Sequence, residues 1–206
     1  MRVVALEEHV MFGAIANRID KDVIARRAFV PGSSRPGSNP LPLLEDVGEG
    51  RLKSMDDNGL TVQVLSVTGP GAELVEGDAG IAVARDYNDA IYEKTRAHPT
   101  RLAAFAHLPM TVPQAAADEL ERAVEKLGFC GALINGLTND RFLDDRQFDP
   151  ILARAEKLAV PLYLHPGIPP QAVRDAYYSG MSPMADKLLS MSGFGWHVET
   201  AIQSCA

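Results

Sequence analysis

Residues 3–9 read Val-Val-Ala-Leu-Glu-Glu-His, an apolar run that ends in two carboxylates and an imidazole. The run contains no glycine or proline and favours a β-strand. Because side chains alternate across a strand, Glu7 and His9 are expected on one face, and Leu6 and Glu8 on the other, packed against helices. The stretch therefore predicts a strand whose last residues carry polar, metal-ligating groups.

Four more strand-like runs follow at regular intervals, over residues 62–67, 102–107, 131–134 and 161–165. Amphipathic helical patterns separate these runs. One helix is expected to begin at Pro113 and to end at Gly128. Another is expected to have Asp149 as its N-cap and Pro150 at its first helical position. Strands that alternate with helices in this way are typical of βα units around a parallel sheet.

The remaining segments give simpler predictions. Apolar residues at helical spacing over residues 44–58 predict one helix that ends before Gly59. Residues 31–37 are rich in proline, glycine and serine and predict a loop that is longer than a simple connection. A loop with proline and glycine is expected after residue 165, followed by a helix from about Ala185.

Two architectures fit alternating strands and helices: a doubly wound sheet and a (β/α)₈ barrel. A doubly wound dinucleotide-binding fold is disfavoured because no glycine-rich fingerprint follows residues 3–9. Polar side chains fall instead at the carboxyl ends of the predicted strands, at Glu7, His9, His107, Asn135 and His165. A (β/α)₈ barrel places its active site at that end, so the barrel is the predicted fold.

Glu7, His9 and His165 are the candidate metal ligands from their positions alone. Glu7 and His9 are about 7 Å apart along one strand face, close enough to converge on one divalent cation. His165 ends another strand in the same register and could supply a third ligand from across the barrel. The alternative is that the three residues end their strands with local hydrogen bonds only.

The composition excludes several classes of protein. The 206 residues carry a formal net charge of −7, and a general nucleic-acid binder would need clustered lysine and arginine. No apolar run reaches the roughly 18 residues of a membrane helix. The two cysteines, Cys130 and Cys205, are too few for a disulfide framework and fit a reducing compartment, so a cytoplasmic location is expected.

Several motifs share an order and spacing with a known family. They are residues 5–9 (Ala-Leu-Glu-Glu-His), 55–59 (Met-Asp-Asp-Asn-Gly), 64–66, 69–71 (Gly-Pro-Gly), Asn88, 135–136, 142–145 (Phe-Leu-Asp-Asp), 161–166 (Pro-Leu-Tyr-Leu-His-Pro) and 199–201. Together they resemble the amidohydrolase-related metal-dependent decarboxylases, which act on hydroxybenzoates such as γ-resorcylate, 2,3-dihydroxybenzoate and 5-carboxyvanillate. The resemblance covers nearly the whole chain.

The resemblance implies a (β/α)₈ barrel and a metal-dependent, non-oxidative decarboxylation of a small aromatic carboxylate. It implies one divalent cation, Zn²⁺ or Mn²⁺, held by Glu7, His9, His165 and an aspartate of the eighth strand. It also implies a catalytic histidine and an acidic residue near the sixth strand. Neither the aspartate nor the sixth-strand stretch has a counterpart within the 206 residues. Members of the family commonly form dimers or tetramers, so a homo-oligomer is expected.

Three further residues are candidates for substrate contact: Phe12, His107 and Asn135. The alternatives are a general apolar wall at Phe12, a solvated strand-end histidine at His107 and a simple turn at Asn135.

The length of the chain is short for a complete barrel. A barrel needs roughly 250 residues, so residues 1–206 are expected to form a single, carboxyl-terminally truncated barrel domain of about five βα units that is inactive alone. Two other functions are kept open. One is metal-dependent hydrolysis of a lactone or an amide on the same scaffold. The other is a non-catalytic remnant.

Overall fold

Five parallel strands form the centre of the molecule in the computed structural model, which describes residues 1–23, 41–68, 71–165, 167 and 170–178. They are β1 (Val4–Val10), β2 (Val62–Val67), β3 (Leu102–Ala104), β4 (Ala132–Asn135) and β5 (Leu162–His165). Hydrogen bonds join β1, β2 and β3 in one group and β4 and β5 in a second. A parallel bridge between Ala106 and Ala132 links the two groups. The strand order therefore follows the chain, as the predicted βα units require.

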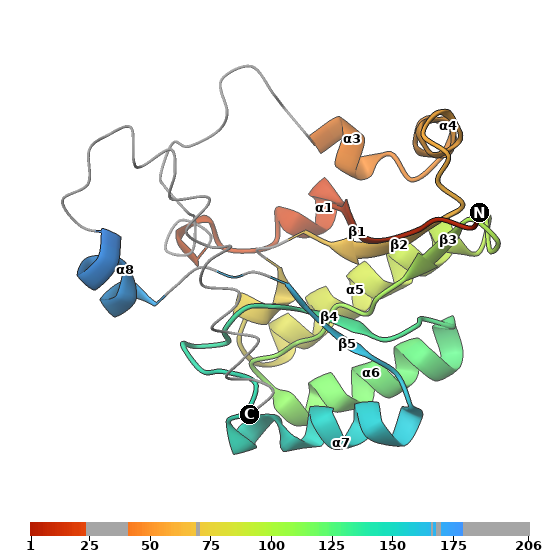
Figure 1. Ribbon diagram of the computed structural model, residues 1–206. Helices are drawn as coiled ribbons and strands as arrows, with labels where there is room; N and C mark the ends of the chain where they lie inside the picture. The colour runs from red at the N-terminus through yellow and green to blue at the C-terminus, as the bar shows by residue number, and fades with distance from the viewer. Residues whose placement is uncertain (24–40, 69–70, 166, 168–169, 179–206) are drawn as a thin grey trace.

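Helices connect and cover these strands: α1 (Gly13–Ala16), α3 (Leu41–Glu45), α4 (Glu49–Asp57), α5 (Gly77–Thr95), α6 (Pro113–Leu127), α7 (Asp149–Leu158) and α8 (Gln171–Tyr178), with short 3₁₀ turns η1 (Ala72–Leu74) and η2 (Arg146–Phe148). In Figure 1, α5, α6 and α7 lie along one side of the strands. The predicted limits of α6 are confirmed, since Pro113 begins it and Gly128 ends it with a left-handed φ of 71°. These helices lie where the outer layer of a barrel is expected.

Some predicted boundaries are wrong for local reasons. The strand expected over residues 102–107 ends at Ala104, because Phe105 N still donates to Leu65 O while Ala106 N already donates to Gly131 O. The helix expected over residues 44–58 is two helices. Between them the side chain of Asp46 accepts from Gly48 N at 2.9 Å, which makes a turn.

Other differences lie near the second half of the chain. The N-cap of α7 is Phe148, and Asp149 is already helical. Helix α8 occupies residues that were expected to form a loop. The loop predicted over residues 31–37 and the helix predicted from about Ala185 lie outside the described residues.

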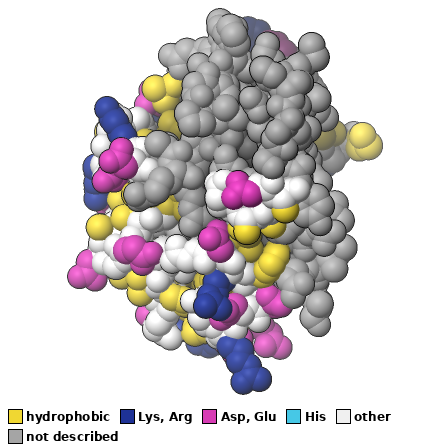
Figure 2. Space-filling view, turned by 90° about the vertical axis from the view of Figure 1, so that its left-hand side faces the viewer, with side chains coloured by type: hydrophobic (Ala, Val, Ile, Leu, Met, Phe, Trp, Pro, Cys, Tyr) yellow, Lys and Arg dark blue, Asp and Glu magenta, His cyan; other side chains and the backbone are white. Residues whose placement is uncertain are grey.

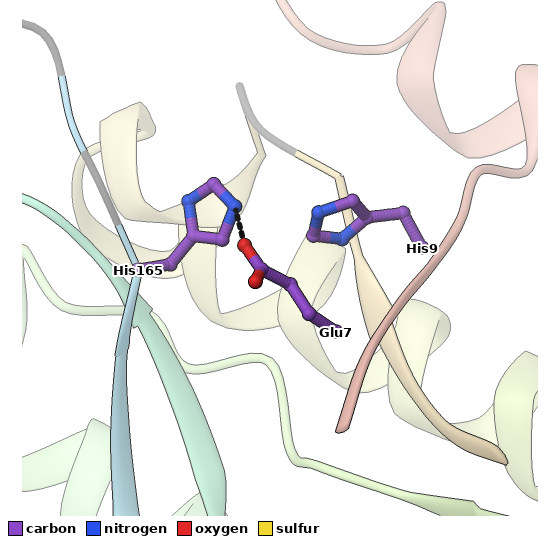
Figure 3. Close-up of side chains that lie close together, drawn as sticks. All are labelled: Glu7, His9 and His165. Atoms are coloured by element: carbon purple, nitrogen blue, oxygen red, sulfur yellow. Dashed lines mark ion pairs between the residues drawn. The ribbon is translucent and has the colours of Figure 1, made fainter. Parts of the chain in front are cut away.

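Strand β1 does not alternate regularly. A bulge adds one residue between Ala5, which pairs with Gln63, and Glu8, which pairs with Leu65. The expectation that Leu6 packs against helices is wrong, because Leu6 is 46% exposed. Glu7 and His9 nevertheless both point toward His165, as Figure 3 shows.

The two faces of the sheet carry separate apolar clusters. The larger joins strand residues such as Leu65 to the buried faces of α5, α6 and α7. On the other face, Val64, Phe105 and Leu133 form a small buried cluster against Tyr163. The rings of Phe105 and Tyr163 stack with centroids 5.6 Å apart. Residues from β2, β4 and β5, together with Phe105 just after β3, therefore converge on one interior, as in a curved sheet.

The surface adds two observations. Figure 2 shows acidic and basic side chains spread among hydrophobic ones on the described part of one face, so that part carries no patch of a single charge sign. Among the described residues, no helix combines the length and the apolar character that crossing a bilayer requires.

Candidate metal centre

The three predicted metal ligands come together although they lie far apart in the chain. Glu7 and His9 extend from β1, and His165 is the last residue of β5. Figure 3 shows Glu7 between the two imidazole rings. One potential ligand atom from each residue lies within 4.8 Å of the others. The curvature of the sheet thus converts three strand-end residues into one cluster.

Direct contacts hold the cluster together. His165 Nε2 lies 3.0 Å from Glu7 Oε1. The rings of His9 and His165 meet edge to face, with centroids 5.0 Å apart. The Tyr163 hydroxyl donates to the other carboxylate oxygen, Glu7 Oε2, at 3.4 Å. Both oxygens of Glu7 therefore have partners on β5.

The surroundings of His9 favour its neutral form. Burial is the largest cause that lowers the pKa of His9, and the neighbouring His165 and the Arg51 guanidinium lower it further, while Glu7 opposes them. Arg51 also donates to His9 O at 2.9 Å, so it fixes the backbone of β1 at this residue. A neutral imidazole is the form that binds a metal ion.

The donor set fits a divalent cation. It consists of one carboxylate and two imidazoles, and the side chains of Glu7 and His165 are 45% and 22% exposed, so solvent reaches the cluster. Nitrogen and carboxylate donors suit Zn²⁺, and carboxylates also suit Mn²⁺. Catalytic zinc sites typically use three protein ligands and keep a further position for water or substrate.

The three candidate substrate contacts have different surroundings. Asn135 is the register partner of His165 on the neighbouring strand β4. Phe12 follows β1 and packs against Tyr87 with ring centroids 6.2 Å apart. The ring of His107 also contacts Tyr87, with ring centroids 5.4 Å apart. None of the three belongs to the cluster of potential ligand atoms.

His107 is not a solvated strand-end residue, because its side chain is only 2% exposed. Its Nε2 accepts from Ala72 N at 2.8 Å, and Glu73 Oε2 lies 3.4 Å from the same nitrogen. Burial lowers the pKa of His107, and Glu73 opposes this effect. Asn88 holds the backbone of His107 on both sides, since His107 N donates to Asn88 Oδ1 and Asn88 Nδ2 donates to His107 O. The described contacts of His107 are therefore with the protein.

Three residues that contact the cluster, Ser66, Tyr163 and Arg51, were given no role by the sequence pattern. Ser66 Oγ lies 3.1 Å from His9 Nδ1, and Tyr163 contacts Glu7. A signal for Ser66 was present, because it is a hydroxyl in the otherwise mostly apolar strand β2. Tyr163 gave a weaker signal, since a tyrosine two residues before a strand-end histidine is also an ordinary interior residue.

A cavity of about 500 Å³ lies elsewhere, at the loop between β4 and α7. Its lining is mostly polar and acidic: Asn139, Asp140, Arg141, Phe142, Asp144 and Asp145. It contains none of the predicted site residues, so it is separate from the cluster of Glu7, His9 and His165.

The chain is similar to known proteins over most of its length. A family model described as amidohydrolase matches residues 37–205. The gamma-resorcylate decarboxylase of a Rhizobium species is 37% identical over 173 residues, which are 81% of this chain and 50% of that protein. The chain therefore spans about half the length of the curated relatives it matches.

Solved structures show the same relation. The 5-carboxyvanillate decarboxylase of Sphingomonas paucimobilis has a TM-score of 0.77 at 30% identity, covering 87% of this chain and 56% of that chain. A dihydroxybenzoic acid decarboxylase of a Polaromonas species, solved with manganese and the inhibitor 2-nitroresorcinol, has a TM-score of 0.72 at 30% identity, covering 97% of this chain and 60% of that chain. These likenesses and the family match confirm the predicted barrel architecture over the doubly wound sheet.

Proposed function

The chain belongs to the amidohydrolase family, and on that premise we propose that its protein is a metal-dependent decarboxylase. Its substrate is a hydroxylated benzoate, from which it releases carbon dioxide without oxidation. The single observation that carries the proposal is the convergence of Glu7, His9 and His165 within 4.8 Å. The names of the relatives and structural neighbours support the same reaction class.

Glu7, His9 and His165 are the proposed holders of one Mn²⁺ or Zn²⁺. A divalent cation bound there supplies Lewis-acid chemistry and a template toward an anionic substrate. Tyr163 and Arg51 keep the donors in place, through Glu7 Oε2 and through the carbonyl of His9. Manganese is favoured by the contents of the neighbouring structures and zinc by the two imidazoles.

The substrate is proposed to lie beside this centre, against Phe12 and Asn135. His107 is proposed to shape the wall of the substrate site, because it is buried and accepts a hydrogen bond from Ala72 N.

The family's hydroxybenzoate chemistry suggests a place in the breakdown of aromatic compounds. We also propose that residues 1–206 belong to one domain, that the protein is cytoplasmic and that it forms a homo-oligomer, which light scattering would measure.

The test uses the longest natural protein that contains residues 1–206. Carbon dioxide release from γ-resorcylate and 5-carboxyvanillate is measured with Mn²⁺ and with Zn²⁺. Release that depends on the metal is the expected result. Glu7→Gln should weaken metal binding more than about 100-fold, beyond the effect of an outer-shell change, and should abolish release.

Glu8→Gln is the matched control, because Glu8 is the adjacent carboxylate, faces Arg51 at 3.9 Å and is not part of the cluster. It should retain both metal and activity. Metal-dependent cleavage of lactones or amides without carbon dioxide release would replace the decarboxylase by a hydrolase. Absence of both stoichiometric metal and turnover would favour a non-catalytic protein.

A further inference from the structure

Ser66 is a buried hydroxyl placed directly beside one candidate ligand. It lies in β2, is 1% exposed and is the register partner of His9 in β1. Its Oγ is 3.1 Å from His9 Nδ1. Its neighbour on the same face of β2, Val64, is apolar and buried, so packing alone would favour a small apolar side chain at residue 66.

The contact decides which ring nitrogen of His9 is left for other partners. A neutral imidazole has one nitrogen that donates and one that accepts. Ser66 is the contact at Nδ1, and Figure 3 shows one ring nitrogen of His9 on the side that faces Glu7 and His165. A nitrogen that binds a cation cannot carry a proton, so Nε2 can serve as a ligand only when the proton is on Nδ1.

We propose that Ser66 is a positioning residue for His9. Its hydroxyl oxygen accepts a hydrogen bond from Nδ1–H, holds the ring in the tautomer with an unprotonated Nε2 and prevents rotation of the ring away from Glu7 and His165. This inference rests on the metal centre of the proposed function. It assigns to Ser66 the role of fixing the tautomer and orientation of His9 in the metal-free protein.

The bulge in β1 is what places His9 opposite Ser66. Without the extra residue between Ala5 and Glu8, the register of β1 against β2 would be shifted by one position. His9 would then pair with Val67, which has no hydrogen-bonding side chain, and Ser66 would pair with Glu8. Arg51 secures the same register, because it donates to His9 O and lies 3.2 Å from Gln63 Oε1 on β2.

The first readout is the tautomer of His9 in the metal-free 206-residue chain, observed by long-range ¹H–¹⁵N NMR with labelled histidine. The wild-type ring is expected to carry its proton on Nδ1. Ser66→Ala should shift the ring toward a mixture of tautomers. The second readout is Mn²⁺ affinity by calorimetry, where Ser66→Ala should lose about 10–100-fold, as outer-shell changes typically do.

Ser66→Thr and Ser66→Val form a matched pair of nearly equal shape that differ in the hydroxyl. Thr should keep the wild-type tautomer and affinity, and Val should behave like Ala. This pair also answers the question if Ser66→Ala fails to fold. Equal tautomers and equal Mn²⁺ affinities in Thr and Val variants would overturn the role of Ser66.

The metal centre and the positioning role of Ser66 can be refuted independently. If wild-type protein binds no Mn²⁺, the metal centre is wrong, while the tautomer measurement still tests the contact of Ser66 with His9. If wild type binds Mn²⁺ and the hydroxyl makes no difference to tautomer or affinity, only the inference about Ser66 is wrong.

Discussion

His107 is a buried histidine whose ring connects two segments of the chain. Its Nε2 accepts from Ala72 N, so this nitrogen carries no proton in the folded state. Protonation would remove the acceptor and place a charge in a site with 2% exposure. Glu73 lies close enough to offset part of that cost, but burial is the larger effect and lowers the pKa of His107.

This lowered pKa predicts a pH dependence of stability. Below the ordinary histidine pKa of 6.5, the unfolded chain binds a proton at residue 107 that the folded chain does not. The free energy of unfolding should therefore fall as the pH drops below about 6.5, until His107 is protonated in the folded state as well. Above that pH, both states are neutral and this residue contributes no slope. Urea denaturation at a series of pH values measures the effect.

His107→Gln provides the comparison, because the amide oxygen can accept from Ala72 N and does not titrate. Its slope between about pH 5 and 6.5 should be flatter than that of the wild type. His98→Gln removes a histidine outside this network and should leave the contribution of His107 in place. An unchanged slope in His107→Gln would contradict the assignment.

At the level of single residues, the sequence predicts the candidate ligands better than it predicts the residues that contact and orient them. Glu7, His9 and His165 are visible because carboxylates and imidazoles at strand ends are chemically distinctive. Ser66, Tyr163 and Arg51 are ordinary residues whose roles depend on register and on a bulge. No pattern of spacing predicts the contact between Ser66 and His9, because the bulge decides which residue of β2 faces His9.

The elements were predictable where local signals agree. Helix α6 has proline at its start, a regular apolar face and glycine at its end, and its bounds match the prediction. Strand β3 and the two helices α3 and α4 were not, because their ends depend on backbone partners in other elements and on a turn made by Asp46. Local propensity predicts the presence of an element, and tertiary contacts set its length.

Two glycines allow a test of how local conformation and tertiary contacts contribute to the stability of these elements. Gly128 ends α6 at a φ of 71°, and a Cβ there would meet nothing within 4 Å. Gly128→Ala should therefore cost only the left-handed conformation, roughly 1–2 kcal/mol of unfolding free energy. Gly131 has a φ of 148°, and a Cβ there would clash with Pro161 O, just before β5. Gly131→Ala should cost clearly more, because it also forces β4 and β5 apart.

Chemical denaturation of both variants makes the comparison, with far-UV circular dichroism to verify the fold. Equal losses for the two substitutions would show that the approach of residue 161 to residue 131 is not tight. A loss at Gly128 close to zero would show that α6 does not need its left-handed cap.

At the scale of the whole molecule, the site depends on curvature. Glu7 and His165 belong to the first and last of the five strands, yet lie 3.0 Å apart. The stacked rings of Phe105 and Tyr163 and the bridge between Ala106 and Ala132 connect the strands between them. The sequence predicts that parallel strands align their carboxyl ends, but the closeness of β1 to β5 follows from the fold as a whole.

A metal ion bound by Glu7, His9 and His165 would join β1 to β5, so the proposed centre should stabilise the entire described sheet. At a concentration about 100 times the dissociation constant, binding adds about 2.7 kcal/mol to the free energy of unfolding. For a chain of this size, that corresponds to a rise in melting temperature of about 5–10 °C. Differential scanning calorimetry with and without Mn²⁺ measures the rise. His165→Asn should remove it, while Glu8→Gln should keep it, because Glu8 is not in the cluster. An equal rise in His165→Asn and wild type would mean that the metal binds elsewhere and that β1 and β5 are held together by the protein alone.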